Sequence, residues 1–263
     1  GKGIVPGDSF TLAASITVLF FTGASILIGN LMNISSSTSQ IAVGAIIGMG
    51  IAAGNLDYSV IGKILMWWLL SAVIAFWISA VIGRYVYDRT VEFLKNQTSE
   101  KIRAGLVILV GCYMAFSAGS SNVANAIAPL VGSGSVQMMP AVLMACAAIA
   151  VGVFTFGPRI MKAIGGDITD LPLEASLLVM TVSASLITLL SAGGIPASLS
   201  VIATLSIIGL GWGRATRRVP IERELGVKEL RKKDERRMEE DELDLYKPEI
   251  TAKMFMVWTG TPI

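Results

Sequence analysis

Four long stretches of the chain carry no charged side chain, and this limits the environments in which the chain can fold. The stretches are residues 9–56, 64–83, 104–158 and 175–213. A helix that crosses a bilayer needs about 20 mostly apolar residues, so each stretch can hold at least one crossing. Charged residues make up only 15% of the chain, against about 25% in an ordinary soluble domain. We therefore expect an all-α integral membrane protein.

The apolar pattern predicts membrane-spanning helices over residues 9–29, 58–85, 104–118, 136–156 and 171–190. Polar segments interrupt this pattern at residues 30–40, 116–134 and 191–200. After these segments we expect shorter helices over 41–54, over 122–131, and from residue 200 to residue 213. Interrupted helices at membrane depth must line a cavity or be covered by protein, because their freed backbone groups need partners. The segments therefore predict broken helices and re-entrant half-helices.

Two of the polar segments belong to an internal repeat. Residues 33–50 align with residues 194–211 at a constant offset of 161, which pairs Ser37 with Ser198 and Ser39 with Ser200. Inverted repeats with discontinuous helices are typical of secondary transporters, whose substrate sites lie near the middle of the membrane. The fold class expected here is thus an inverted-repeat transporter with broken helices and re-entrant half-helices.

The repeat also divides the chain. Residues 1–103 would be the remainder of a first repeat with a connecting loop, and residues 104–213 the second repeat. Residues 214–249 would be a soluble charged segment, and residues 250–263 the start of a further transmembrane helix. The partner of Ser121 in the first repeat would lie about 40 residues before Gly1, so we expect the chain to be the middle of a longer transporter.

Basic residues predict the orientation in the cell membrane. Residues 84–103 hold five Lys or Arg and residues 214–237 hold ten, whereas the link at residues 55–58 holds none. Loops rich in Lys and Arg face the cytoplasm. Segments 84–103 and 214–249 are therefore expected on the cytoplasmic side of a multi-pass protein.

Helix ends inside the membrane suggest the chemistry of the site. A helix N-terminus carries partial positive charge and free N–H donors, which suits an anion. Such ends are expected near Ser37, near Ser121 and near Ser198. No Lys or Arg lies in the polar segments, so dipoles and hydroxyls would hold an anion there.

The residues of these segments resemble those of the inorganic phosphate transporter (PiT) family. The sequence AFSAGSSNVANAIAPL is similar to the family signature hGaNDvANAigP. ISSSTSQIAVGAIIGMG and GIPASLSVIATLSIIGLG resemble the element PVSTTHaivGaiiGvG, which occurs once in each repeat. The resemblance covers roughly residues 10–213, with a further W…P at 258–262. It implies transport of phosphate, or in some members sulfate, with sodium or protons.

The resemblance and the helix ends together nominate a set of substrate-binding residues: Ser37, Thr38, Ser39, Ser121, Asn122, Asn125, Ser198 and Ser200. The alternatives are simple helix capping for Ser37, Thr38 and Ser39, an interhelical hydrogen bond for Asn122, and packing for Asn125. Gln40 and Asn122 are weaker candidates for contact with a coupling cation.

The chain departs from the family pattern at the positions that would bind a cation. Ser121 and Asn122 replace the Asn and Asp of the signature, and Gln40 and Val201 replace the His of the second element. The missing carboxylate removes the strongest oxygen ligand for a hard cation and an obvious proton carrier. It also lowers the repulsion that a doubly charged anion would meet, which suits sulfate as well as phosphate.

Other functions are disfavoured. The chain has no histidine, so histidine-based catalysis and metal ligation are excluded, and we expect no enzyme, no nucleic-acid partner and no cofactor apart from sodium or a proton as coupling ion. The expected partners are inorganic phosphate or sulfate and the lipid bilayer, with a homodimer left open. The alternatives are a degenerate membrane scaffold or receptor of the same fold and a passive channel.

Overall fold

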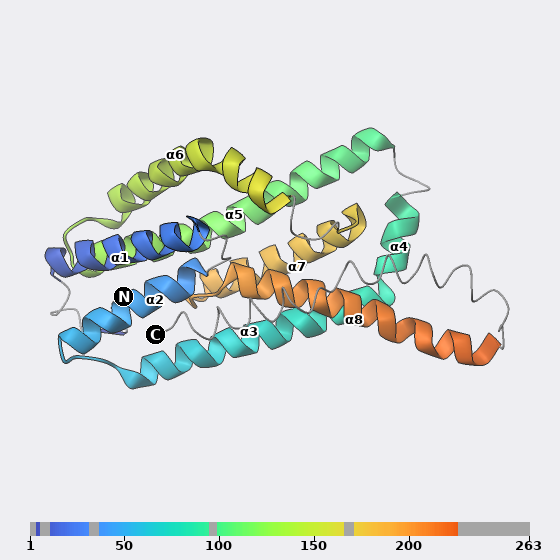
Figure 1. Ribbon diagram of the computed structural model, residues 1–263, viewed down its shortest axis with the longest axis horizontal. Helices are drawn as coiled ribbons and strands as arrows, with labels where there is room; N and C mark the ends of the chain where they lie inside the picture. Colours follow the sequence, from blue (N-terminus) through green and yellow to red (C-terminus); the bar gives the residue numbers. More distant parts are fainter. Residues whose placement is uncertain (1–3, 6–10, 32–36, 95–98, 166–170, 226–263) are drawn as a thin grey trace.

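A computed structural model describes residues 4–5, 11–31, 37–94, 99–165 and 171–225 of the chain, and these residues form an all-helical bundle (Figure 1). The helices are α1 (Leu12–Leu31), α2 (Thr38–Ala52), α3 (Tyr58–Tyr85), α4 (Tyr87–Glu92), α5 (Glu100–Gly132), α6 (Met138–Gly165), α7 (Leu173–Ala192) and α8 (Leu199–Leu225). Within the described ranges, six helices are long and apolar enough to cross a membrane, and α2 is shorter, with 15 residues. The prediction of a multi-pass membrane protein is confirmed. Residues 226–249 and 250–263, with their predicted charged segment and helix start, lie outside the described residues.

The internal repeat is present in three dimensions. Helices α1 and α7 each have 20 residues, and their first residues, Leu12 and Leu173, differ by the same offset of 161 that separates Thr38 and Leu199, where α2 and α8 begin. In Figure 1, α2 runs toward the end of the bundle where a short link leads to α3, whereas α8 runs toward the opposite end. The two copies are therefore inverted, as the fold class expected from the sequence predicts.

The second polar segment does not interrupt a helix, which corrects the prediction of a separate short helix over 122–131. Helix α5 is continuous over 33 residues and includes the whole sequence from Ser117 to Pro129. The Ser117 hydroxyl lies 3.0 Å from the Tyr113 carbonyl oxygen, and the Ser120 hydroxyl donates to the Ser117 carbonyl at 2.8 Å. Because such hydroxyls find partners within their own helix, serine is tolerated there without a break.

Two further helix boundaries and one predicted loop differ from the sequence-based expectation. Helix α6 continues past residue 156 to Gly165, and α8 continues past residue 213 to Leu225. The charged loop at 84–103 contains the short helix α4. Charged side chains do not themselves end a helix, so the loss of apolar character after residue 213 marks a change of environment and not a change of secondary structure.

Helices α3 and α8 make the closest contact in the bundle. A Cβ atom added to Gly209 would collide with the backbone of Phe76, and one added to Gly213 would collide with the backbone of Ala80. Small residues at such positions let helix backbones approach closely in membrane proteins. This seam joins a helix of the first repeat to a helix of the second.

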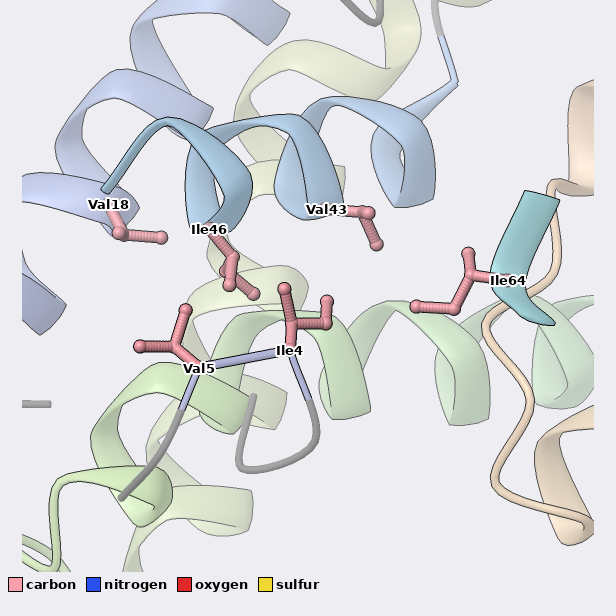
Figure 2. Packing of buried hydrophobic residues seen from close by; sticks show 6 residues of the cluster. All are labelled: Ile4, Val5, Val18, Val43, Ile46 and Ile64. Carbon is pink, nitrogen blue, oxygen red and sulfur yellow. The ribbon is translucent and has the colours of Figure 1, made fainter. Parts of the chain in front are cut away.

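A separate apolar cluster lies between α1, α2 and α3 (Figure 2). Ile4 and Val5 extend from the N-terminal segment to meet Val18 of α1, Val43 and Ile46 of α2, and Ile64 of α3. The Ile4 carbonyl accepts a hydrogen bond from the Asp57 backbone N–H at 3.0 Å, which anchors the segment to the link before α3. The cluster packs α2 against α1, α3 and the N-terminal segment.

Candidate functional site

The two repeat-related helices begin with the same cap. The Ser37 hydroxyl accepts from the Gln40 backbone N–H at 3.4 Å, and the Ser198 hydroxyl accepts from the Val201 backbone N–H at 3.3 Å. Both serines are buried, with 2% and 3% of their surface exposed. A side-chain oxygen that accepts from the third residue of a helix is the usual N-cap arrangement, so both residues act as helix caps.

Hydrogen bonds bring the three polar segments together. Thr38 Oγ1 donates to Asn122 Oδ1 at 2.7 Å, which links α2 to α5. Asn125 Nδ2 donates to Ser39 Oγ at 2.9 Å, and Ser39 Oγ donates to the Ala197 carbonyl oxygen at 2.7 Å. The hydrogen bonds from Asn125 to Ser39 and from Ser39 to Ala197 connect α5, α2 and the segment just before α8, so the three polar segments converge as expected. The interhelical hydrogen bond considered as the alternative for Asn122 is also present.

The segment before α8 has a second anchor. Trp68 of α3 donates its indole N–H to the Pro196 carbonyl oxygen at 2.8 Å. Carbonyl oxygens in an interrupted helix would otherwise be unpaired in an apolar environment, which is costly. Trp68 and Ser39 therefore satisfy two adjacent carbonyls and fix the position of the α8 N-terminus.

A cavity of about 580 Å³ lies beside this network. Its polar wall comes from α5 and α7 and consists of Ser120, Ser121, Asn125, Thr188 and Ser191. Its apolar wall includes Ile4, Ile46 and Ile64. Water occupies about 30 Å³ per molecule in the liquid, so the cavity has room for a tetrahedral oxyanion with several waters.

No charged side chain is found among the described residues that line the cavity. Hydroxyl and amide N–H groups are the side-chain donors that it offers, and the N-terminus of α2 lies one hydrogen bond away through Ser39 and Asn125. Helix N-termini contribute about half a positive charge each, and such partial charges act more strongly where the local dielectric constant is low. The arrangement is suited to an anion with several acceptor oxygens.

The structure places seven of the eight nominated substrate-binding residues in three groups and leaves Ser200 apart from them. Ser121 and Asn125 line the cavity directly, and Thr38, Ser39 and Asn122 form the hydrogen-bonded network behind it. Ser37 and Ser198 cap the two helices, and Ser200 lies half-buried in the first turn of α8, outside the cavity lining. Gln40 is 8% exposed, and its buried side-chain oxygen has no hydrogen-bond partner among the described residues.

Sequence reasoning missed the contribution of α7. Thr188 and Ser191 line the cavity, but they lie in a helix for which the sequence predicted a membrane span and no site residue. The available signal was their spacing, since residues three apart share a face of a helix. Polar residues on one face of an otherwise apolar span indicate a cavity or an interface.

These features define a class of protein: a helical membrane protein built from inverted repeats, with a partly polar cavity between the repeat helices. The chain belongs to the phosphate transporter family, whose model matches residues 1–97 and 84–263. Compared with the sulfate permease CysP of Bacillus subtilis, it is 30% identical over 213 residues, which cover 81% of this chain and 60% of that protein.

Two further comparisons agree. A putative phosphate permease of Haemophilus influenzae is 32% identical over 127 residues, which are 44% of this chain and 30% of that protein. The chain thus spans less than two thirds of these curated relatives. A solved structure described as the sodium-dependent phosphate transporter has a TM-score of 0.66 at 20% identity, covering 84% of this chain and 76% of that one, and shows the same fold.

Proposed function

We propose that the chain forms part of a secondary active transporter that carries an inorganic oxyanion, phosphate or sulfate, across the cytoplasmic membrane. One observation supports this most strongly: the hydrogen-bonded chain Asn125–Ser39–Ala197 joins the two inverted copies beside a cavity whose described lining is uncharged. A scaffold of the same fold would not need a cavity lined by hydroxyl and amide donors. Both substrates remain in the proposal, since relatives are named for each.

In this proposal, Asn125, Ser121, Thr188 and Ser191 donate hydrogen bonds to the oxygens of the anion. Asn125 now donates to Ser39, so binding would exchange that bond for one to the substrate. Exchange of this kind couples occupancy of the cavity to the contact between α2 and α5. The anion would then have different affinities for two conformations of the protein. Alternating access requires such a difference, because a ligand can shift an equilibrium only toward the conformation that it binds more tightly.

The coupling ion is proposed to be sodium or a proton. Within the described ranges, Gln40 Oε1 has no hydrogen-bond partner and Asn122 Oδ1 accepts a hydrogen bond from Thr38, so both are neutral oxygens that can face a cation. Sodium prefers oxygen ligands, and neutral oxygens bind it more weakly than carboxylates do. Residues 84–103 and 214–249 are proposed to face the cytoplasm, and a homodimer is a proposed assembly.

The test is flux in proteoliposomes that contain the full-length protein. Uptake of labelled phosphate and of labelled sulfate is measured with an inward sodium gradient, with an inward proton gradient, and with neither. Accumulation above equilibrium for at least one anion, driven by at least one gradient, is expected. Uptake of neither anion above that of empty liposomes would contradict the proposal, and uptake that ignores every gradient would indicate a passive channel.

The site assignment has its own test. Substitutions of Thr38 and Asn122, and of the capping residues Ser37 and Ser198, should each strongly reduce uptake while the protein remains inserted in the membrane. Insertion is checked by protease protection of the same preparations. Unchanged uptake in all four variants would remove these residues from the site.

A further inference from the structure

Three fully buried serine hydroxyls on α3, α7 and α8 have no hydrogen-bond partner among the described residues. They belong to Ser79 of α3, Ser183 of α7 and Ser206 of α8, each at most 1% exposed. An unpaired buried hydroxyl costs free energy, so each one in a native structure needs an explanation. Three of them on helices that all contact one another call for a common explanation.

Other serines of the same helices do not share this property. The Ser71 hydroxyl of α3 donates to the Trp68 carbonyl oxygen at 3.0 Å, and the Ser185 hydroxyl of α7 donates to the Thr181 carbonyl oxygen at 2.8 Å. Bonds within one helix are a common way for a buried serine to pair its hydroxyl. The three unpaired serines do not use this solution, so their hydroxyls are directed elsewhere.

An apolar layer lies one helical turn from all three serines. It includes Ala75 of α3, Ile187 of α7 and Ile202 of α8, which belong to one buried cluster. Each of these residues is four positions from the serine of its own helix, and residues four apart share a face of a helix. Each serine therefore lies on the face that its helix turns toward the other two.

A second apolar layer lies one turn away on the other side of the serines. Val179 of α7 and Leu210 of α8 belong to one buried cluster, and a Cβ atom added to Gly83 of α3 would collide with the backbone of Leu210. These three residues are again four positions from the serines, with α7 running opposite to α3 and α8. The serines thus occupy one level between two apolar layers.

The serine level has the composition of a water site. Its side chains are smaller than the Ile, Val and Leu side chains of the adjacent layers, and no two of the three hydroxyls bond to each other. Buried waters typically make about three hydrogen bonds to polar groups that otherwise lack partners. A bare cation is disfavoured, because three neutral hydroxyls do not offset the loss of its hydration.

We propose that a buried water molecule binds among Ser79, Ser183 and Ser206 and joins the three helices. Helix α3 belongs to the first copy of the repeat, and α7 and α8 belong to the second, so the water bridges the two copies. None of the three serines lines the cavity, and the inference does not depend on the proposed function.

A crystal structure of the full-length protein, at a resolution that shows ordered waters, tests the site directly. We expect a density peak within hydrogen-bonding distance of at least two of the three hydroxyls, and no such peak in the Ser79→Ala/Ser206→Ala variant. Hydroxyls that bond to carbonyl oxygens of their own helices, with no peak between them, would overturn the proposal. A peak with the shorter ligand distances of a cation would overturn it as well.

Thermal unfolding gives an independent test in solution. Ser79→Ala or Ser183→Ala alone should leave the midpoint unchanged or slightly higher, because the water keeps two hydroxyl partners and alanine is the better helix former. The double variant leaves one hydroxyl, too few to hold the water, and should lower the midpoint by about 2–4 °C beyond the sum of the single changes. Ser71→Ala with Ser185→Ala is the matched control pair on the same helices, and its effects should add. Additive effects in the test pair would contradict the bridging water.

Discussion

The hydroxyl of Ser39, in the first turn of α2, donates a 2.7 Å hydrogen bond to the carbonyl oxygen of Ala197, the residue before the cap of α8. The two partners come from opposite copies of the repeat, so this hydrogen bond joins the two copies directly. The same hydroxyl accepts from Asn125. One small side chain therefore connects α2, α5 and the start of α8.

Ser39→Ala should lower both stability and uptake. It leaves the Ala197 carbonyl and the Asn125 amide without their present partner, and an unpaired buried polar group costs about 1–3 kcal/mol. We expect a lower midpoint of thermal unfolding and at least a tenfold loss of anion uptake. Ser183→Ala is the control, because it removes a buried hydroxyl that has no hydrogen-bond partner in the part of the chain that the structure describes, and it should leave the midpoint unchanged or raise it. A Ser39→Ala midpoint equal to that of the wild type would show that the bond is not structural.

Asn122→Asp should weaken anion binding in sodium-free medium. The Asp side chain can still accept from Thr38 Oγ1, but its carboxylate adds a negative charge beside the cavity. We expect the KM for phosphate or sulfate to rise at least tenfold, with a smaller defect at acidic pH, where the carboxyl is protonated and neutral. Asn122→Leu, which loses the hydrogen bond without adding charge, should show a defect that does not change with pH. Equal pH profiles for the two variants would exclude the electrostatic explanation.

Much of the fold follows from hydropathy and spacing. The limits of α3 agree with the uncharged stretch and its flanks, and the offset that relates Ser37 to Ser198 also relates the first residues of α1 and α7. These features depend on local or periodic patterns of residues, so they can be predicted from the sequence alone. The continuity of α5 was not predictable in this way, because it depends on whether Ser117 and Asn122 find partners within the fold.

The candidate site was predictable only in part. Ser121 and Asn125 lie in a polar segment that is conspicuous in the sequence, and both line the cavity. Thr188 and Ser191 are isolated polar residues in an apolar helix, and their role depends on the packing of α7 against α5. Tertiary contacts of this kind are not encoded in hydropathy.

Gly209→Ala should destabilise the bundle far more than Gly211→Ala. A Cβ at Gly209 would meet the backbone of Phe76, whereas a Cβ at Gly211 has no atom within 4 Å. Overpacking of a close helix contact costs about 1–3 kcal/mol, while alanine in an open helix position is favoured over glycine by about 0.5–1 kcal/mol. Thermal unfolding of the purified variants measures both effects. Equal midpoints would mean that α3 and α8 do not meet at this seam.

Gln40→Leu should reduce the response of uptake to sodium if Gln40 Oε1 faces the coupling ion. The substitution keeps the approximate size of the side chain but removes the unpartnered oxygen. We expect the sodium concentration for half-maximal uptake to rise several-fold while the KM for the anion at saturating sodium changes little. Gln137→Leu, at an exposed position between α5 and α6, is the control. An unchanged sodium dependence in Gln40→Leu would remove this residue from the cation site.

In the proposed site, Ser121, Asn125, Thr188 and Ser191 surround a bound oxyanion. Crystals of the full-length protein grown with selenate, a tetrahedral analogue of sulfate, test this arrangement through the anomalous signal of selenium. We expect a selenium peak within the cavity, within hydrogen-bonding reach of Asn125 Nδ2, that disappears when excess sulfate or phosphate is added. A cavity without this peak, in crystals whose protein binds selenate elsewhere in the membrane region, would show that these four residues do not form the anion site.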